Sequence, residues 1–267
     1  MGTPEVSRQF NGEQKPRSTF IPTVIEETPT GRIQTDPFSR LQKEQIIYLY
    51  EDVNNVTSAL IVAQFMHILN NPKSKDIHFY IQSPGGSVYD GAAVIDMMEK
   101  MKDNGFIIHT HAVGLSMSMG SQFLVHGSRG YRSCEPNATI MLHEPAGGGN
   151  NGKIEDQINS TEEGAHLKTR TAMTYAANSN LSYERAMEII TGPDYFIRGE
   201  EAVAMGLVDQ VDYPDHNPNY AAALKQMNMD HWELHKRKAE IEQPGLKKTM
   251  PDFGKSDYSS APSPEIK

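Results

Sequence analysis

Short apolar runs alternate along the chain with longer segments in which apolar residues recur every three or four positions. The runs are rich in β-branched and aromatic residues, which is typical of buried strands, and they lie at 45–50, 77–82, 106–113, 138–143 and 207–211. The periodic segments are typical of amphipathic helices and lie at 53–69, 88–101, 153–178, 182–190 and 200–206. This alternation predicts an α/β architecture with a parallel sheet, in which functional groups gather at the ends of the strands.

A glycine- and serine-rich segment follows the apolar run at 106–113. Residues 114–121 have the sequence Gly-Leu-Ser-Met-Ser-Met-Gly-Ser, and a helix is expected from there to about Val125. A turn this small can present the hydroxyl of Ser118 at a helix start, beside backbone N–H groups that are suited to holding an oxyanion. The alternative is a connection whose serines only cap the helix.

A serine nucleophile needs a base and a group that orients the base. Of the ten histidines, His143 has the most suggestive position, because it ends the apolar run at 138–143 and precedes a glycine-rich loop. In a parallel sheet this places it at the same edge as Ser118. Four acidic residues are candidates for the orienting carboxylate: Glu155, Asp156, Asp194 and Asp209.

Other histidines are less suggestive. His109 and His111 share one face of a strand, but no third ligand occurs at a suitable spacing, so we expect no metal. Four histidines in polar helices or in the tail are expected to be solvated: His166, His216, His231 and His235.

Composition limits the class of protein. Hydrophobic residues make up 37% of the 267 residues, so part of the chain is expected to be unpacked. The net charge of −9 argues against a nucleic-acid partner. The single cysteine, Cys134, excludes a disulfide framework and is expected to be buried in a protein from a reducing compartment. No apolar run approaches the roughly 18–20 residues of a membrane span, so no membrane association is expected.

The two ends of the chain differ from its centre. Residues 1–19 are polar and predict a flexible leader or propeptide, and an extended piece at 20–27, a turn at 28–31 and a short helix capped by Asp36 follow. We expect one domain over 20–212. Residues 213–267 are expected to be a C-terminal extension, helical over 221–242 and then disordered.

Separated motifs resemble, in order and spacing, those of the ClpP peptidase family. They are Tyr-Ile-Gln-Ser-Pro-Gly-Gly-Ser at 80–87, Gly114 with Ser118-Met119-Gly120, Met-Leu-His-Glu-Pro at 141–145 and Asp-Tyr-Phe at 194–196. The resemblance implies the ClpP/crotonase-like ββα spiral fold with a protruding handle helix at 153–178. It also implies two stacked heptameric rings, of this chain or of close paralogues, and unfolded polypeptide substrates delivered by an AAA+ unfoldase of the Clp type. ATP would be used by that partner, and no cofactor is expected in this chain.

The resemblance also assigns roles by position. Ser118 would be the nucleophile, His143 the general base and Asp194 the carboxylate that orients it. The backbone N–H groups of Gly86 and Met119 would form the oxyanion hole. The loop at 147–152 would supply a strand that aligns the substrate.

The chain departs from the family pattern at Pro193, at His78, at Glu51, by an extra residue at or near Asn150 and by its long C-terminal extension. Pro193 stands where many members have an arginine that pairs between rings, and His78 stands where a tyrosine often contributes to unfoldase docking. Alternatives to an ATP-dependent serine endopeptidase are a non-catalytic ring subunit, a crotonase-type acyl-CoA enzyme and an unfoldase-independent peptidase such as a capsid maturation protease. We expect a cytoplasmic protein of protein quality control, with the plastid stroma as the alternative.

Overall fold

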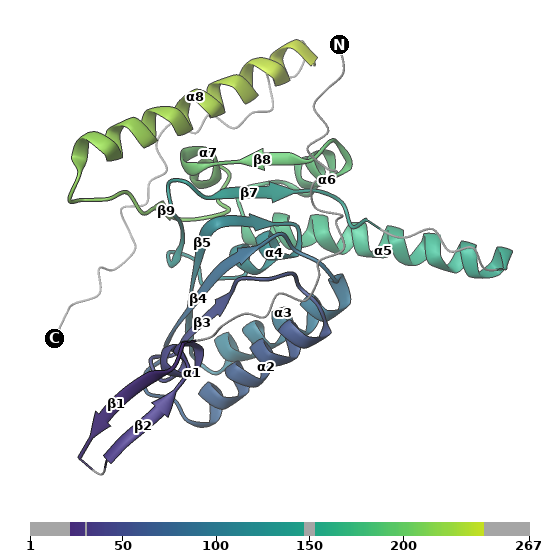
Figure 1. The fold of residues 1–267 in the computed structure, drawn as a ribbon. Coiled ribbons are helices and arrows are strands. Elements are labelled where there is room, and N and C mark those ends of the chain that lie inside the picture. The colour runs from purple at the N-terminus through teal and green to yellow at the C-terminus, as the bar shows by residue number, and fades with distance from the viewer. Residues whose placement is uncertain (1–21, 30, 147–152, 243–267) are drawn as a thin grey trace. The chain divides into compact units, whose positions relative to one another are not determined.

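The computed structural model describes residues 22–29, 31–146 and 153–242 (Figure 1). The predicted leader, the loop at 147–152 and the residues beyond 242 lie outside the described residues. The chain divides into two compact units, Met1–Glu44 and Gln45–Lys267.

The small unit contains an antiparallel hairpin, β1 (Val24–Thr28) and β2 (Gly31–Thr35), and the helix α1 (Pro37–Gln42). Asp36 caps α1 as the sequence predicts, because its Oδ1 accepts a hydrogen bond of 2.9 Å from the Ser39 N–H. Glu26 of β1 forms ion pairs with Arg40 and Lys43 at the end of this helix. The second strand of the hairpin is not evident in the sequence, where only a turn was expected.

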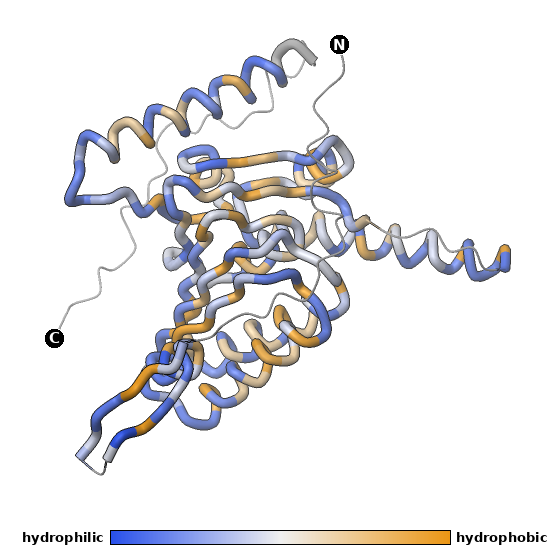
Figure 2. The backbone as a smooth tube through the Cα atoms, in the orientation of Figure 1, coloured by the Kyte–Doolittle hydropathy of each residue, from blue (hydrophilic) through white to orange (hydrophobic). Residues whose placement is uncertain are grey.

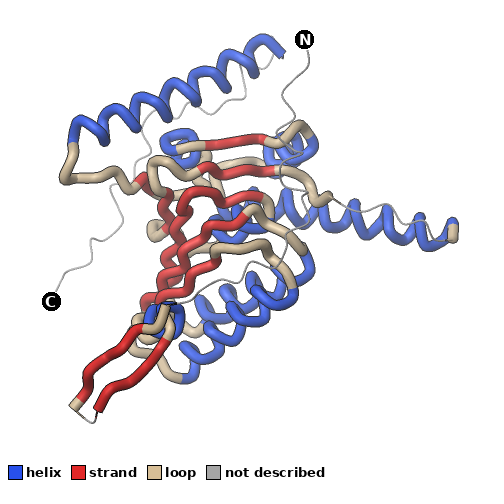
Figure 3. Tube along the Cα trace, in the orientation of Figure 1, coloured by secondary structure: helices blue, strands red, loops and turns tan. Residues whose placement is uncertain are grey.

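The large unit is built on a seven-stranded sheet, in which β3, β4, β5, β6 and β9 follow one another and β7 and β8 branch from β5. All pairings are parallel except β7 with β8. The strands are β3 (Ile46–Leu49), β4 (Asp76–Ser83), β5 (Ile107–Met117), β6 (Arg132–Cys134), β7 (Thr139–Leu142), β8 (Tyr195–Ile197) and β9 (Gln210–Val211). Figure 3 shows these strands running through the body of the unit.

The sheet forks along β5, its longest strand. One edge of β5 pairs with β4, and the other pairs first with β6, over Thr110–Ala112, and then with β7, over Leu115–Met117. Residues 114–117 are therefore strand, and the expectation that the turn begins at Gly114 is wrong. The β7 ladder extends β5 to the residue before Ser118, so the connection to the following helix is a single residue.

The helices of the large unit connect and cover these strands. They are α2 (Asn55–Asn70), α3 (Val88–Asp103), α4 (Met119–Val125), α5 (Ile154–Asn178), α6 (Tyr183–Thr191), α7 (Gly199–Ala204) and α8 (Pro218–Glu242). Hydrophobic residues, orange in Figure 2, are frequent in the strands and in the helices that cover them. The Phe79 ring of β4 packs against Phe65 of α2 in a T-shaped arrangement and against Phe123 of α4 in a tilted one, which places the core between sheet and helices. Cys134 is fully buried, as predicted.

Helix α5 has two different halves. Residues 153–166 are exposed, whereas Thr171, Ala172 and Tyr175 are buried against the body of the unit. The N-terminal half thus projects beyond the sheet (Figure 1), as expected of a handle helix. Within the described ranges, no helix combines the length and the apolar character needed to cross a membrane.

Candidate active site

Ser118 forms the whole connection between β5 and α4. Its backbone has φ 52° and ψ −120°, in the region of positive φ that residues with a side chain seldom occupy. Its N–H donates to the Met141 carbonyl of β7 (2.9 Å), and its own carbonyl accepts from the N–H groups of Ser121 (3.0 Å) and Gln122 (3.2 Å). The hydrogen bond to β7 on the N-terminal side of Ser118 and the start of α4 on its C-terminal side hold this backbone conformation. Such a conformation costs of the order of 1–3 kcal/mol. As a result, the side chain projects out of the turn.

Two buried hydroxyl groups, those of Ser121 and Tyr175, support the Ser118 turn. Ser121 Oγ lies 2.7 Å from the Ser118 carbonyl oxygen, 3.0 Å from the Met141 carbonyl oxygen and 2.8 Å from the Tyr175 hydroxyl. Tyr175 comes from the buried half of α5, and burial raises the pKa of its phenol well above the usual range. It therefore stays protonated and can donate to Ser121. Sequence reasoning missed both residues; the only signal was a serine three positions after Ser118.

His143 follows β7 directly and faces Ser118. Its Nε2 lies 2.8 Å from Ser118 Oγ, and its Nδ1 lies 3.3 Å from Asp194 Oδ1. The register of β7 with β8 explains the second contact. Leu142, the last residue of β7, is paired with Tyr195, the first residue of β8, in an antiparallel ladder. His143, which follows β7, and Asp194, which precedes β8, therefore come opposite each other.

The glycine loop between β4 and α3 touches the Ser118 turn. A Cβ on Gly85 would lie 2.6 Å from Ser118 Cβ and 2.9 Å from the Met119 nitrogen, so only glycine allows this approach. Val53 bridges the loop through its N–H to the Gly85 carbonyl (2.8 Å) and its carbonyl to the Ser87 N–H (2.7 Å). In such a parallel bridge the N–H of Gly86 faces away from Val53.

The Met119 N–H belongs to the first turn of α4, and the N–H groups of a first turn have no acceptor within their own helix. The two N–H groups to which the resemblance assigns the oxyanion hole, on Gly86 and Met119, therefore come from backbone segments that touch beside Ser118. The arrangement of hydroxyl, imidazole, carboxylate and amide donors is chemically capable of acyl transfer, in which Ser118 loses its proton to His143.

The other carboxylate candidates lie elsewhere. Asp209 binds the buried guanidinium of Arg132, with 2.7 Å between its Oδ1 and Nη2. Asp156 accepts a hydrogen bond from the Lys153 N–H at the start of α5 (3.3 Å), where Glu155 is exposed.

The other histidines are placed as follows. His111 has its Nε2 3.1 Å from His78 Nδ1, and His109 has its Nε2 2.9 Å from Asp76 Oδ1, so both are engaged within the sheet. His166 and His216 are exposed, as expected. The expectation that His231 and His235 are solvated is wrong, because both are partly buried against Glu201.

The family model described as Clp protease matches residues 29–214, which is more than half of the chain and includes Ser118, His143 and Asp194. The α/β architecture with its parallel sheet agrees with the fold of that family.

Proposed function

The chain belongs to the Clp protease family, and we propose that it is a serine endopeptidase subunit that cleaves unfolded polypeptides. In this proposal Ser118 is the nucleophile, His143 the general base and Asp194 the group that orients the base. The 2.8 Å contact between His143 Nε2 and Ser118 Oγ is the observation on which the proposal rests. A non-catalytic ring subunit would have no need of this contact or of the strained Ser118 turn.

The chemistry follows from the contacts. Ser118 Oγ attacks the peptide carbonyl carbon while His143 Nε2 takes its proton, and Asp194 stabilises the imidazolium that forms. The N–H groups of Gly86 and Met119 receive the charge on the carbonyl oxygen, and each such donor contributes roughly 3–4 kcal/mol to the transition state. The proton passes to the leaving amine, the C–N bond breaks, and the acyl group remains on Ser118. Water then repeats the sequence and releases the new carboxylic acid.

A fluorophosphonate probe tests the assignment. We expect one adduct per chain, at Ser118 by mass spectrometry, and loss of labelling in His143→Ala. Ser160→Ala, which removes an exposed hydroxyl from the projecting half of α5, should leave labelling unchanged. Absence of labelling in an assembled particle would favour the scaffold alternative, and an adduct at another serine would refute the assignment.

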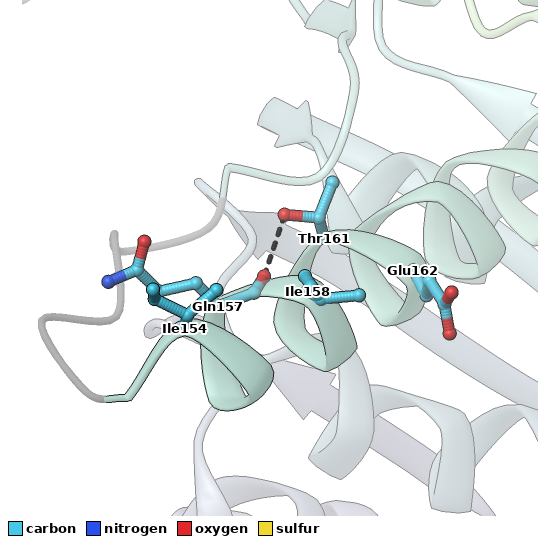
Figure 4. Close-up of a pocket in the computed structure, with 5 residues that line it drawn as sticks. All are labelled: Ile154, Gln157, Ile158, Thr161 and Glu162. Carbon is cyan, nitrogen blue, oxygen red and sulfur yellow. Dashed lines mark hydrogen bonds between the residues drawn. The ribbon is translucent and has the colours of Figure 1, made fainter.

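Exposed apolar side chains on two helices support assembly into rings. On α2 these are Val56, Leu60 and Met66, and on α5 they are Ile154, Ile158 and Met173. Figure 4 shows the depression that Ile154 and Ile158 line together with Gln157, Thr161 and Glu162. Apolar surface of this kind is expected at an interface between subunits. We propose that α2 contacts a neighbour in the same ring and that the projecting half of α5 joins two stacked heptameric rings.

Native mass spectrometry distinguishes the assembly steps. The double ring should dissociate into single rings in Ile154→Asp/Ile158→Asp, whereas Leu60→Asp should break the rings themselves. Delivery of substrates by an AAA+ unfoldase of the Clp type has its own test, which is degradation of a folded protein only when unfoldase and ATP are both present. Cleavage that the unfoldase does not accelerate would favour an unfoldase-independent peptidase. His78 bears on this alternative, because it stands where a tyrosine often contributes to unfoldase docking.

A further inference from the structure

Three side chains from α7 and α8 converge on one point, away from Ser118. They are Glu201, His231 and His235, and one ligand atom from each lies within 4.8 Å of the other two. His235 Nδ1 lies 2.9 Å from Glu201 Oε1 and 3.0 Å from Oε2, and His231 Nδ1 lies 3.6 Å from Oε2. The two histidines are four residues apart in α8, so they lie on the same face of the helix.

Helix α8 is seated by contacts outside this cluster. Leu224 is buried, and Asn228 is fully buried with its Nδ2 donating to the Pro136 carbonyl (3.1 Å). A Cβ on Gly199 of α7 would lie 2.7 Å from Asn228 Cγ, so this glycine allows the two helices to approach. The side chains of Glu201, His231 and His235 are therefore brought together by the fold itself.

The cluster combines a buried carboxylate with a buried ring nitrogen. The Glu201 side chain is only 3% exposed, and a buried carboxylate is stable as an anion only beside positive charge. His231 Nδ1 is buried, and no hydrogen-bond partner for it occurs among the residues that the structure describes. A cation at the meeting point would bind the carboxylate and this nitrogen together.

We propose that Glu201, His231 and His235 bind a divalent transition metal of the Zn²⁺ type, which clamps α8 to α7. Tetrahedral bonds of about 2.0–2.1 Å put neighbouring ligand atoms about 3.3 Å apart, and the distances from Nδ1 to carboxylate oxygen in the cluster lie on both sides of this value. Two imidazoles and one carboxylate favour Zn²⁺, Co²⁺ or Ni²⁺ over Mg²⁺ and Ca²⁺. A neutral ring that binds through Nδ1 carries its hydrogen on Nε2.

Tyr195 supplies an outer partner for the site. Its hydroxyl donates to Glu201 Oε1 (2.9 Å), which orients the carboxylate as outer partners of metal ligands do. Tyr195 is also the first residue of β8 and directly follows Asp194. The proposed metal site is thus joined, through the Tyr195 side chain, to the residue that follows Asp194.

The test uses the full, untagged chain, stripped with a chelator and dialysed. Zn²⁺ is titrated in competition with a chromophoric chelator, and Co²⁺ binding is followed by its visible absorption. We expect one metal per chain, tetrahedral Co²⁺ bands, no competition from Mg²⁺, and slower amide exchange in α8 when Zn²⁺ is bound. His231→Gln and His235→Gln should each weaken Zn²⁺ binding by more than the roughly 10–100-fold that loss of an outer partner costs.

Two matched variants serve as controls. His166→Gln, on the exposed half of α5, and His111→Gln, in the histidine group of β4 and β5, should bind Zn²⁺ as the unchanged chain does. Circular dichroism checks that each variant is folded. The proposal fails if the unchanged chain does not bind Zn²⁺, if His231→Gln binds it equally well, or if His111→Gln removes the binding.

Discussion

The two branches of the sheet that leave β5 use polar residues in opposite ways. On the β7–β8 branch, His143 is half-buried, and Asp194 is 52% exposed with a single 3.3 Å contact to that histidine in the described part of the chain. On the β6–β9 branch, Arg132 is buried and Asp209 accepts from the Gly130 N–H (2.7 Å), the Arg132 N–H (3.0 Å) and the guanidinium.

The difference shows how burial separates a carboxylate suited to catalysis from a carboxylate that stabilises the fold. A carboxylate that stabilises a transient imidazolium needs acceptor capacity that is not already filled and a histidine that a substrate can reach. A carboxylate that holds structure has its acceptor positions filled and its partner removed from water. We therefore expect substitutions on the β7–β8 branch to change rates, and substitutions on the β6–β9 branch to change stability.

The largest expected effect is that of replacing Ser118, at the end of β5. Ser118→Ala should lower kcat for a peptide substrate by about 10⁶-fold, because no covalent step remains. The melting temperature and the ring mass should stay close to those of the unchanged chain. Residual activity above a hundredth of the original would show that another nucleophile does the chemistry.

Asp194→Asn should lower kcat by about 10⁴-fold, because the amide favours the wrong tautomer of the imidazole. The unfolding midpoint in urea should hardly move, since the side chain is exposed. Progress curves at saturating substrate measure the rate, and Asp209→Asn is the matched control for the same chemical change. Equal losses of rate in both variants would contradict the expectation that only the β7–β8 branch affects the rate.

Gly86→Ala should lower kcat by about 10²–10³-fold, which is the cost of losing one oxyanion donor. The added Cβ would overlap the Val53 carbonyl and push the loop away from Ser118. Gly130→Ala is the control, because Gly130 also has a positive φ but has open space around it. If both variants lose the same activity, backbone strain and not donor position is responsible.

Asp209→Asn should lower the free energy of unfolding by about 3 kcal/mol, because it leaves the Arg132 charge buried without its partner. At a permissive temperature kcat should be unchanged. Urea unfolding measures the first quantity and a peptide assay the second. A loss of rate without a loss of stability would contradict the assignment of this branch to structure.

Acid titration sharpens the same prediction. Burial opposes ionisation of Asp209, but its hydrogen bonds with Arg132 and with the Gly130 N–H outweigh burial and lower the pKa of the carboxyl. Because the folded pKa lies below the unfolded value of about 3.9, the stabilisation is complete above that value and is lost as the pH falls through the folded pKa. The melting temperatures of the unchanged chain and of Asp209→Asn should therefore converge in acid.

The smallest effect is expected from Tyr175→Phe, which touches the support of the Ser118 turn. Loss of the hydroxyl should cost about 1 kcal/mol of stability, as for one hydrogen bond. The rate should fall only slightly, because Ser121 still bonds to the carbonyls of Ser118 and Met141. Thermal melts and kcat measured on the same samples compare the two effects. A large loss of rate would mean that the phenol positions the nucleophile.

The sequence predicts the β7–β8 branch better than the β6–β9 branch. The strand at 138–143 and His143 at its end are evident because apolar residues and the loop signal are local. Strand β6 is not evident, because Arg132 in a three-residue strand becomes explicable only through Asp209, far along the chain. Residues 114–117 have the composition of a turn and become strand through the ladder with β7.

Contacts between side chains of different helices could not be predicted from the sequence either. His231 and His235 are surrounded by charged residues, which is typical of a solvated helix face. Their environment is set by Glu201 of α7, a contact that no local pattern specifies. The described α8 does fall where a helix was expected, starting three residues earlier, at Pro218.

The antiparallel ladder of β7 and β8 is only three residue pairs long. Short ladders at the end of a sheet open at a lower free energy than the strands of the core. If this ladder opens, the His143 imidazole loses its contact with the Asp194 carboxylate. Warming should therefore lower the peptidase rate reversibly at temperatures below those that unfold the large unit.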